Sequence, residues 1–325
     1  MRTPSVLDFE LDLQDAYDRL APSEKTYAHV KGDVERRYFG LSRSGCPFRF
    51  LLLDERGCYS VFPHSHASAF LWGVHYWERD DNRQWTKAPF CPRWMGDPEL
   101  RKVTGIDFDP TGLQPRIHNL FRGFDASFLP ETPPGEVEAL SACVHDHVLR
   151  VLANGDPEAA ASLTDWLAGL LQHPGRMSRV APVLVGGRAN LFMRWVRLSL
   201  IGARYSSDVG DDPQCLVNRL FVHVDSRWAV EPMMAFLVKS PTIKELVSSD
   251  TDSCEVREVP NYINAVFTTT SELIVRFIGD RMAFPLFMCS NALCGDVNYF
   301  DRLETRLADP RVQRAYFQSL MTRPL

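Results

Sequence analysis

From residue 181 onward, short apolar runs alternate with segments of helical periodicity, and this alternation constrains the fold more than any other feature. Strands that alternate with helices form a parallel sheet with helices on its faces. The sequence therefore predicts an α/β fold for this part of the chain. The expected elements are strands at 181–185, 218–224, 242–247 and 263–269, an apolar run at 282–288, and helices at 190–202, 230–239, 296–307 and 310–321.

Two helices with strong periodicity precede this region, at Glu136–Leu152 and Glu158–Gln172. Between them, Asn154-Gly155-Asp156-Pro157 ends one helix and begins the next, because glycine favours the position after a helix and proline the first turn. The sequence predicts a helical hairpin here. Further upstream we expect helices at 10–21, 24–31 and 65–77, a β-hairpin from Phe48–Leu53 and Cys58–Phe62, and largely irregular structure at 80–135.

The division into domains follows from these patterns and from the linker-like Pro133-Pro134-Gly135. A chain of 325 residues with 45% hydrophobic residues can build more than one core. We expect a small N-terminal α+β domain at 1–130, a helical linker or collar at 131–175, and the α/β domain at 176–325.

Composition excludes several classes of protein. The net charge of −5 argues against a surface coated with positive charge. The eight cysteines form no C-x-x-C pair, which argues against a zinc ribbon or a thioredoxin-like site. No apolar run approaches the ~20 residues of a membrane span, and the acidic N-terminus is unlike a signal or transit peptide. We therefore expect an intracellular protein (cytoplasm, nucleoid or nucleus, or organelle matrix) that is not secreted.

Residues 183–193, Val-Leu-Val-Gly-Gly-Arg-Ala-Asn-Leu-Phe-Met, begin like a phosphate-binding loop. In the pattern G-x-x-x-x-G-K-S/T, backbone amides surround the phosphates, lysine meets the β and γ oxygens, and the hydroxyl binds magnesium. With Gly186 as the first glycine, the second glycine becomes Leu191, the lysine Phe192 and the hydroxyl Met193. The sequence thus predicts that this loop neither binds nor hydrolyses a nucleotide.

Other segments come in a distinctive order around this loop. They are Asp165-Trp-Leu-Ala-Gly-Leu-Leu-Gln-His-Pro-Gly175, Val183-Leu-Val-Gly-Gly187, Arg219-Leu-Phe-Val-His-Val-Asp225, and Val259-Pro-Asn-Tyr262 followed by an apolar strand to Thr270 and by Asp280-Arg281. Upstream lie Ile106-Asp-Phe-Asp-Pro110 and Asn119-Leu-Phe-Arg-Gly-Phe124. In this order and spacing, the chain resembles the superfamily 3 helicase module of phage, plasmid and large-DNA-virus primase-helicases, which are P-loop ATPases of the AAA+ type.

The resemblance implies a P-loop AAA+-like parallel sheet flanked by helices, and also a nucleotide site that has degenerated. The family's Walker B motif ends in Asp-Glu, whereas this chain has Asp225-Ser226, so one carboxylate is missing. The family's polar sensor falls on Thr270 and its arginine near Arg281. The degenerate site would comprise Gly186, Gly187, Leu191, Phe192, Met193, Asp225, Ser226, Thr270 and Arg281. We expect no catalytic residue, cofactor or metal.

An arginine-rich stretch is the best candidate contact surface, because no Asp or Glu lies between residues 176 and 207. Arg194 and Arg197, three apart on the predicted helix, would share a face. Contact with nucleic acid or an acidic partner is one interpretation, and arginines dispersed over a solvated surface are the other. The residues predicted for such a contact are Arg188, Arg194, Arg197 and Arg204, with Arg176 and Arg179 in the same run.

Three further groups favour structural roles. His145 and His147 have i, i+2 spacing, which does not place two metal ligands on one helix face. His64 and His66 lie at a predicted helix start, where helix capping or exposure to solvent is expected. The aromatic residues Trp72, Tyr76 and Trp77 have helical spacing and are expected to pack against the hairpin at 48–62, with stacking on nucleic acid as the alternative.

The sequence favours a catalytically inactive helicase-like protein, a pseudo-ATPase that serves as a structural or assembly subunit of a nucleic-acid-associated complex. One alternative is a divergent active replicative helicase working in a hexamer. The other is a nucleic-acid-binding protein that uses the arginine patch. Protein partners are expected, nucleic acid and further copies of the chain remain open, and no membrane is expected.

Overall fold

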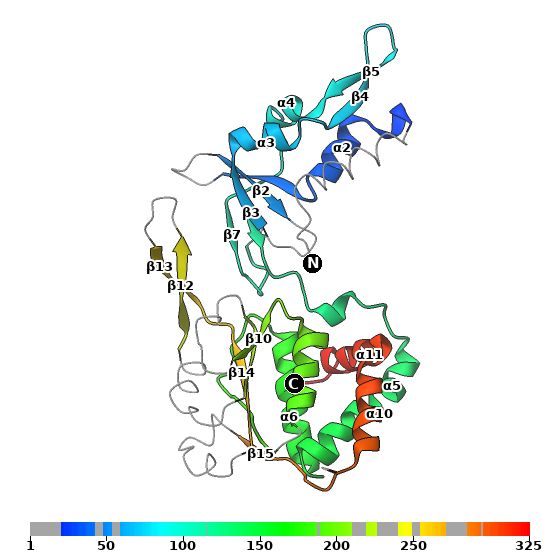
Figure 1. Ribbon diagram of the computed structural model, residues 1–325, viewed down its shortest axis with the longest axis vertical. Coiled ribbons are helices and arrows are strands. Elements are labelled where there is room, and N and C mark those ends of the chain that lie inside the picture. Colours follow the sequence, from blue (N-terminus) through cyan, green and yellow to red (C-terminus); the bar gives the residue numbers. More distant parts are fainter. Residues whose placement is uncertain are drawn as a thin grey trace. The chain divides into compact units, whose positions relative to one another are not determined.

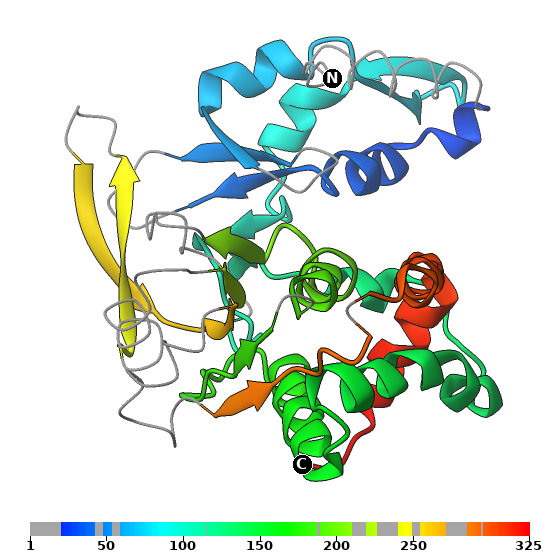
Figure 2. The same ribbon diagram turned by 60° about the horizontal axis from the view of Figure 1, so that its bottom comes forward.

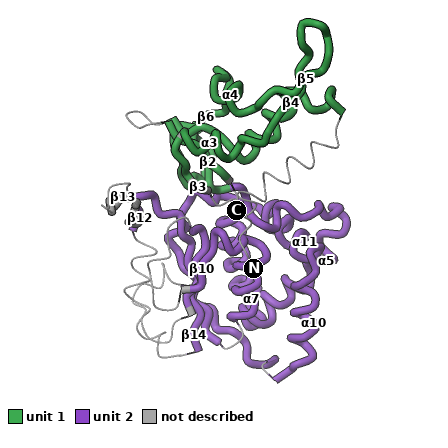
Figure 3. Tube along the Cα trace, turned by 45° about the horizontal axis from the view of Figure 1, so that its top comes forward, with its two compact units in different colours: residues 1–121 green, residues 122–325 purple. Residues whose placement is uncertain are grey.

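The computed structural model describes residues 21–42, 48–53, 59–114, 116–186, 189–209, 219–225, 240–248, 254–270, 285–293 and 295–325. The chain divides into two compact units, unit 1 at residues 1–121 and unit 2 at residues 122–325 (Figure 3). The three-part division with boundaries at 130 and 175 remains a prediction. The expected helices at 10–21 and 230–239 lie outside the described residues.

Unit 1 contains a four-stranded sheet in the order β3-β2-β1-β6. The predicted hairpin at 48–62 is confirmed as the antiparallel pair β2–β3. β1 pairs antiparallel with β2 and parallel with β6 (Figure 1). The strands are β1 (Tyr38–Leu41), β2 (Arg49–Leu53), β3 (Tyr59–Pro63), β4 (His75–Arg79), β5 (Trp85–Pro89), β6 (Lys102–Val103), β7 (Gly105–Asp107) and β8 (Ile117–Asn119), and the helices are the 3-10 turn η1 (Pro22–Glu24), α2 (Tyr27–Val34), α3 (His64–Phe70) and α4 (Phe90–Met95).

The helix predicted at 65–77 is too long, because α3 ends at Phe70 and a strand, β4, begins at His75. Within this strand Tyr76 is buried and stacks edge-on against Tyr27, whereas Trp72 lies in the intervening turn and is 83% exposed. The apolar spacing that predicted one helical face is therefore divided between a helix, a turn and a strand. Of the three aromatic residues Trp72, Tyr76 and Trp77, Tyr76 alone belongs to the hydrophobic core that includes Phe50 of the hairpin.

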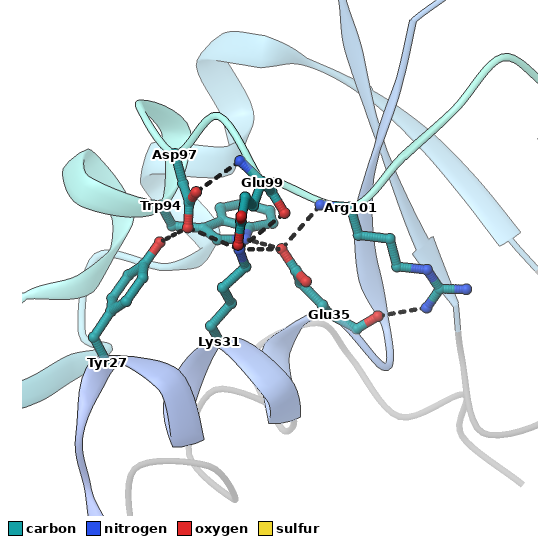
Figure 4. A network of polar contacts seen from close by, with 7 residues as sticks. All are labelled: Tyr27, Lys31, Glu35, Trp94, Asp97, Glu99 and Arg101. Carbon is teal, nitrogen blue, oxygen red and sulfur yellow. Dashed lines mark hydrogen bonds and ion pairs between the residues drawn. The ribbon is translucent and has the colours of Figure 1, made fainter.

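A network of charged groups joins α2 to the segment after α4 (Figure 4). The Asp97 carboxylate accepts hydrogen bonds from Lys31 Nζ at 2.8 Å and from the Tyr27 hydroxyl at 2.5 Å. Glu35 Oε1 accepts from Trp94 Nε1 and from the backbone amide of Arg101, each at 3.0 Å. The hydrogen bonds from Lys31 and then Tyr27 lower the pKa of Asp97 from 3.8 to about 2.

Replacing Asp97 with asparagine is expected to destabilise unit 1 by roughly 1 to 2 kcal/mol at neutral pH, because the charge-assisted bond to Lys31 is lost. The depressed pKa means that the carboxylate stabilises the fold above its unfolded pKa near 4, and that this stabilisation disappears as the pH falls towards 2. Urea denaturation from pH 7 to pH 2 measures the effect.

Glu99→Gln is the matched control for Asp97→Asn, since it removes an exposed carboxylate from the same segment. The control should follow the wild type at every pH, and the Asp97→Asn difference should shrink towards pH 2. An Asp97→Asn difference that stays constant across this range would show that the carboxylate charge does not stabilise the fold.

Unit 2 is built around a five-stranded parallel sheet in the order β10-β11-β14-β9-β15. A separate antiparallel pair, β12–β13, is attached to it (Figure 1). The strands are β9 (Val183–Val185), β10 (Ser206–Val209), β11 (Phe221–Asp225), β12 (Thr242–Ser248), β13 (Cys254–Pro260), β14 (Asn264–Thr269) and β15 (Leu286–Met288). The helices are the 3-10 turn η2 (Asp125–Phe128), α5 (Pro134–His147), the π-helical η3 (Val148–Leu152), α6 (Pro157–Gln172), α7 (Ala189–Trp195), the π-helical η4 (Val196–Ile201), α10 (Val297–Leu307) and α11 (Pro310–Met321).

The predicted helical hairpin is confirmed, with Asp156 capping α6 by accepting from the amides of Glu158 and Ala159. The helix α11, near the C-terminus, packs against α5 and α6 (Figure 1; Figure 2). Gln172 Nε2 donates to the carbonyls of Leu320 and Arg323 at 2.7 and 2.8 Å, and Arg323 forms an ion pair with Asp165. Two residues of the Asp165–Gly175 segment thus hold the end of the chain.

No helix among the described residues is long and apolar enough to cross a membrane.

Candidate nucleotide-binding edge of the parallel sheet

The carboxyl ends of the parallel strands place three residues of the predicted nucleotide site on one edge of the sheet. Gly186 directly follows β9, Asp225 ends β11, and Thr270 directly follows β14. β14 lies between the other two strands and is paired with both. In folds of this type ligands bind at this edge. Gly187, Ser226 and Arg281 lie outside the described residues, and of Asp225 only the backbone is described.

Gly186 is held closely by the neighbouring strand ends. Its amide donates to the carbonyl of Thr269 at 2.8 Å, and its φ of +152° is a conformation that favours glycine. A Cβ at this position would lie 2.8 Å from the Cβ of Cys289. Glycine is therefore required by the packing of the strand ends, whether or not a phosphate ever approaches.

The connection from β9 to the next helix is short. β9 ends at Val185 and α7 is described from Ala189 onward, so at most three residues separate the strand from the helix. In a functional phosphate loop the whole G-x-x-x-x-G-K-S/T segment separates the strand from the helix body. Here the positions of the second glycine, the lysine and the hydroxyl, which are Leu191, Phe192 and Met193, lie inside α7.

Phe192, at the position of the lysine, is completely buried, as is Met193. The Phe192 ring lies 5.7 Å from that of Trp195, 5.8 Å from His147 and 6.4 Å from Tyr316, measured between ring centroids. These partners come from α7, α5 and α11. The side chain at the lysine position therefore belongs to the core between three helices, while Leu191 is only partly buried.

The histidine pair on α5 also serves packing. Burial lowers the pKa of His147 to about 4, so the ring is neutral at physiological pH, and its Nδ1 lies 3.0 Å from the Tyr299 hydroxyl. His145 Nε2 lies 3.3 Å from Ser319 Oγ. In unit 1, His66 is exposed, and nothing is described of the His64 side chain. Over the described ranges, no three His, Cys, Asp or Glu side chains are grouped to hold a metal ion.

A polar relay that the sequence did not predict crosses three adjacent strands. Thr268 Oγ1 of β14 lies 2.8 Å from His223 Nε2 of β11, and His223 Nδ1 lies 3.2 Å from Asp208 Oδ1 of β10. The hydrogen bond from His223 lowers the pKa of Asp208, and the positive charges of Arg197 and Arg194 act in the same direction. The only sequence signal was a histidine within the apolar run Leu220–Val224.

The relay has the order of a nucleophile, a base and an orienting carboxylate. Thr268 and His223 are each 2% exposed, however, so a substrate cannot reach the threonine hydroxyl. The relay therefore joins β10, β11 and β14 to one another, and Asp208 connects it to Arg197 of η4. Its position inside the sheet is that of a structural contact rather than an active site.

The predicted arginine contacts have different surroundings. Arg197 Nη2 lies 3.6 Å from Asp208 Oδ2, and only 17% of the Arg197 side chain is exposed. Arg194 and Arg204 are exposed, with the Arg204 guanidinium 5.9 Å from the centre of the Tyr205 ring. Arg188 lies outside the described residues. The helix face shared by Arg194 and Arg197 thus carries one exposed cation and one that is engaged in an ion pair.

Compared by sequence with protein-family models and with curated proteins, the chain has no match in either. Among solved structures, it is similar to the A-form apo structure of the NrS-1 C-terminal region (305–718), with a TM-score of 0.56, 15% identity, and coverage of 90% of this chain and 70% of that chain. A further apo structure of this region has a TM-score of 0.53, 14% identity, and coverage of 91% and 71%.

A JCV helicase structure with a bound acetamide compound covers 58% of this chain and 55% of its own, at 12% identity and a TM-score of only 0.32. At 15% identity the NrS-1 likeness shows the fold alone. The predicted α/β fold, a parallel sheet flanked by helices, is confirmed, and it is similar to the fold of the NrS-1 C-terminal region. Membership of superfamily 3 and the identity of the nucleotide-site residues remain predictions.

Proposed function

We propose that unit 2 is a degenerate helicase module of superfamily 3 type that does not bind nucleotide and acts as a structural or assembly subunit of a nucleic-acid-associated complex. Three observations support the proposal together: the fold similar to that of the NrS-1 C-terminal region, the separation of β9 from α7 by at most three residues, and the presence of Phe192 at the position aligned with the lysine.

The observation that carries the proposal is the burial of Phe192 between Trp195, His147 and Tyr316. A lysine at the corresponding place in a phosphate loop supplies the positive charge that offsets the β and γ phosphates. A neighbouring subunit can contribute an arginine to a shared site, but the lysine comes from the same chain as the loop. An active hexameric helicase built on this loop is therefore disfavoured.

Purified full-length protein is expected to bind no ATP in isothermal titration calorimetry in the presence of magnesium. A thermal unfolding scan gives an independent reading of binding. Ligand at a hundredfold excess over its Kd would raise the free energy of unfolding by about 2.7 kcal/mol, so true binding would shift the melting temperature clearly. Neither signal should appear.

The same titration with magnesium chelated by EDTA separates specific binding from weak ionic attraction. A magnesium-dependent affinity in the micromolar range would contradict the proposal and would favour the alternative of a divergent active helicase. A strand-displacement assay on a forked duplex would then test that alternative directly.

A further inference from the structure

Residues 173–180, which form most of the loop that joins α6 to β9, are held to the core of unit 2 by the indole of Trp166. Trp166 Nε1 donates to Ser178 Oγ at 3.1 Å and to the carbonyl of Val180 at 2.8 Å. The Val180 amide in turn donates to Ser178 Oγ at 3.1 Å. Trp166 is itself buried against Phe221 of the strand β11. The second half of this loop is thus attached to the sheet through one side chain.

A second buried side chain, Asn264, fixes the first half of the same loop. Its Oδ1 accepts from the Ser178 amide at 2.9 Å, and its Nδ2 lies 3.4 Å from the carbonyl of Arg176. The Arg176 amide donates to the carbonyl of His173 at 2.9 Å. Asn264 is 2% exposed and begins β14, so the loop lies at the amino-terminal edge of the parallel sheet, opposite the edge of Gly186.

This fixed loop presents two exposed arginines, Arg176 and Arg179. Arg179 has a φ of +57°, in the left-handed region that non-glycine residues adopt rarely. Neither guanidinium forms an ion pair with a carboxylate among the described residues, and no Asp or Glu occurs in the sequence between 165 and 208. An unfavourable backbone conformation at one exposed cation, beside a second cation that likewise has no ion pair within the described ranges, is a feature that an anionic ligand would use.

We infer that the loop at 173–180 is a contact site for the sugar–phosphate backbone of a nucleic acid, with Arg176 and Arg179 each binding a phosphate. The inference rests on the proposed association with nucleic acid and specifies where the contact lies. A guanidinium matches a phosphate with two parallel N–H donors, and such contacts position a strand without reading its sequence.

The surroundings of the loop favour nucleic acid over an acidic protein. Protein interfaces are organised around a buried apolar centre, often with an aromatic anchor. Within the loop itself, Met177 and Val180 are only partly exposed, so the loop presents no large exposed hydrophobic side chain as such an anchor. Phosphate contacts require only donors and positive charge, which this loop supplies.

A structural role for the arginines is the competing explanation, because cations near the C-terminus of α6 would stabilise that helix through its dipole. If the arginines have only this structural role, replacing them would lower the stability of unit 2 and would leave nucleic-acid binding unchanged. Arg179 separates the two explanations, since glycine adopts its φ without strain.

The test is the binding of the full chain to a fluorescein-labelled single-stranded oligothymidylate, followed by fluorescence anisotropy over a series of salt concentrations. We expect Arg176→Glu combined with Arg179→Glu to weaken binding by at least about tenfold near physiological salt. The slope of log K against log salt should fall by about 1.4, since each phosphate contact to a single strand contributes about 0.7.

Arg179→Gly should lower the slope by about 0.7 while raising the melting temperature, which a purely structural role for Arg179 would not produce. The matched control is Arg302→Glu with Arg306→Glu on α10, two exposed arginines whose reversal changes the net charge equally. Salt-dependent binding that is equal in the loop double variant and the control, or no binding by the wild type, would overturn the inference. ATP titrations do not enter this test, so its failure is distinct from a failure of the proposed function.

Discussion

Phe192→Lys is expected to destabilise unit 2 by about 4 kcal/mol or more, which is a large part of the stability of an ordinary domain. The side chain is completely buried, and its neighbours are the rings of Trp195, His147 and Tyr316. Lysine at this position would lose the aromatic packing and would place an ammonium group in a core without a carboxylate partner. Urea denaturation followed by circular dichroism measures the loss.

The matched control is Leu191→Lys, one residue earlier on the same helix, where the side chain is only partly buried. Its ammonium group can reach solvent, so we expect a change below about 1 kcal/mol. A variant that combines Leu191→Gly, Phe192→Lys and Met193→Thr restores the letters of the phosphate loop. It is expected to gain no ATP binding, because α7 has already begun at Ala189. A folded Phe192→Lys protein that binds ATP would refute both the packing argument and the proposed loss of nucleotide binding.

The elements that the sequence predicted well are those whose hydrogen bonds and apolar faces are local. α5, α6, α10 and α11 carry their own periodicity and start signals, such as the Asp156–Pro157 and Asp309–Pro310 pairs. The strand β9 and the helix α7 follow from an apolar run and a glycine turn. The order of these elements was sufficient to predict a parallel sheet.

The elements that it missed depend on partners distant in sequence. β10 has the sequence Ser-Ser-Asp-Val, which has little apolar character, and it becomes a strand by pairing with β11 at the edge of the sheet. β13 ends with Val259 and Pro260, the first half of the Val259-Pro-Asn-Tyr262 motif, and it forms as the partner of β12. In unit 1, the spacing of Tyr76 and Trp77 from Trp72 is typical of a helix, but both residues lie in β4, which forms by pairing with β5.

The candidate site shows the same division. Pattern alone aligned Phe192 with the missing lysine, but the direction of that side chain follows from the packing of α5 and α11 against α7. The relay of Asp208, His223 and Thr268 requires the order of β10, β11 and β14, which no local pattern encodes. Likewise, the role of Trp166 in the Asp165–Gly175 segment could not be predicted from the sequence, because it consists of hydrogen bonds from its indole to Ser178 and Val180 in the following loop.

Gly202→Ala is expected to destabilise unit 2 by about 3 kcal/mol or more. Gly202 ends η4 with φ +97° and ψ 144°, in a region that is essentially restricted to glycine. A Cβ at this position would also lie 2.5 Å from both carboxylate oxygens of Asp125, so the Asp125 side chain would have to move. The backbone here is fixed, because the Gly202 carbonyl accepts from Ser206 Oγ at 2.8 Å and from the Tyr205 amide at 3.2 Å.

Two further variants separate backbone strain from the clash. Gly155→Ala, at φ +80° with no atom within 4 Å of the added Cβ, carries strain alone, so we expect a loss of only about 1 kcal/mol. Combining Gly202→Ala with Asp125→Ala removes the carboxylate and should recover part of the lost stability, a coupling that a double-mutant cycle of urea denaturation curves measures. If the two changes at 202 and 125 add without coupling, the contact with the Asp125 carboxylate is not what requires glycine, and the backbone conformation of Gly202 alone determines the loss of stability.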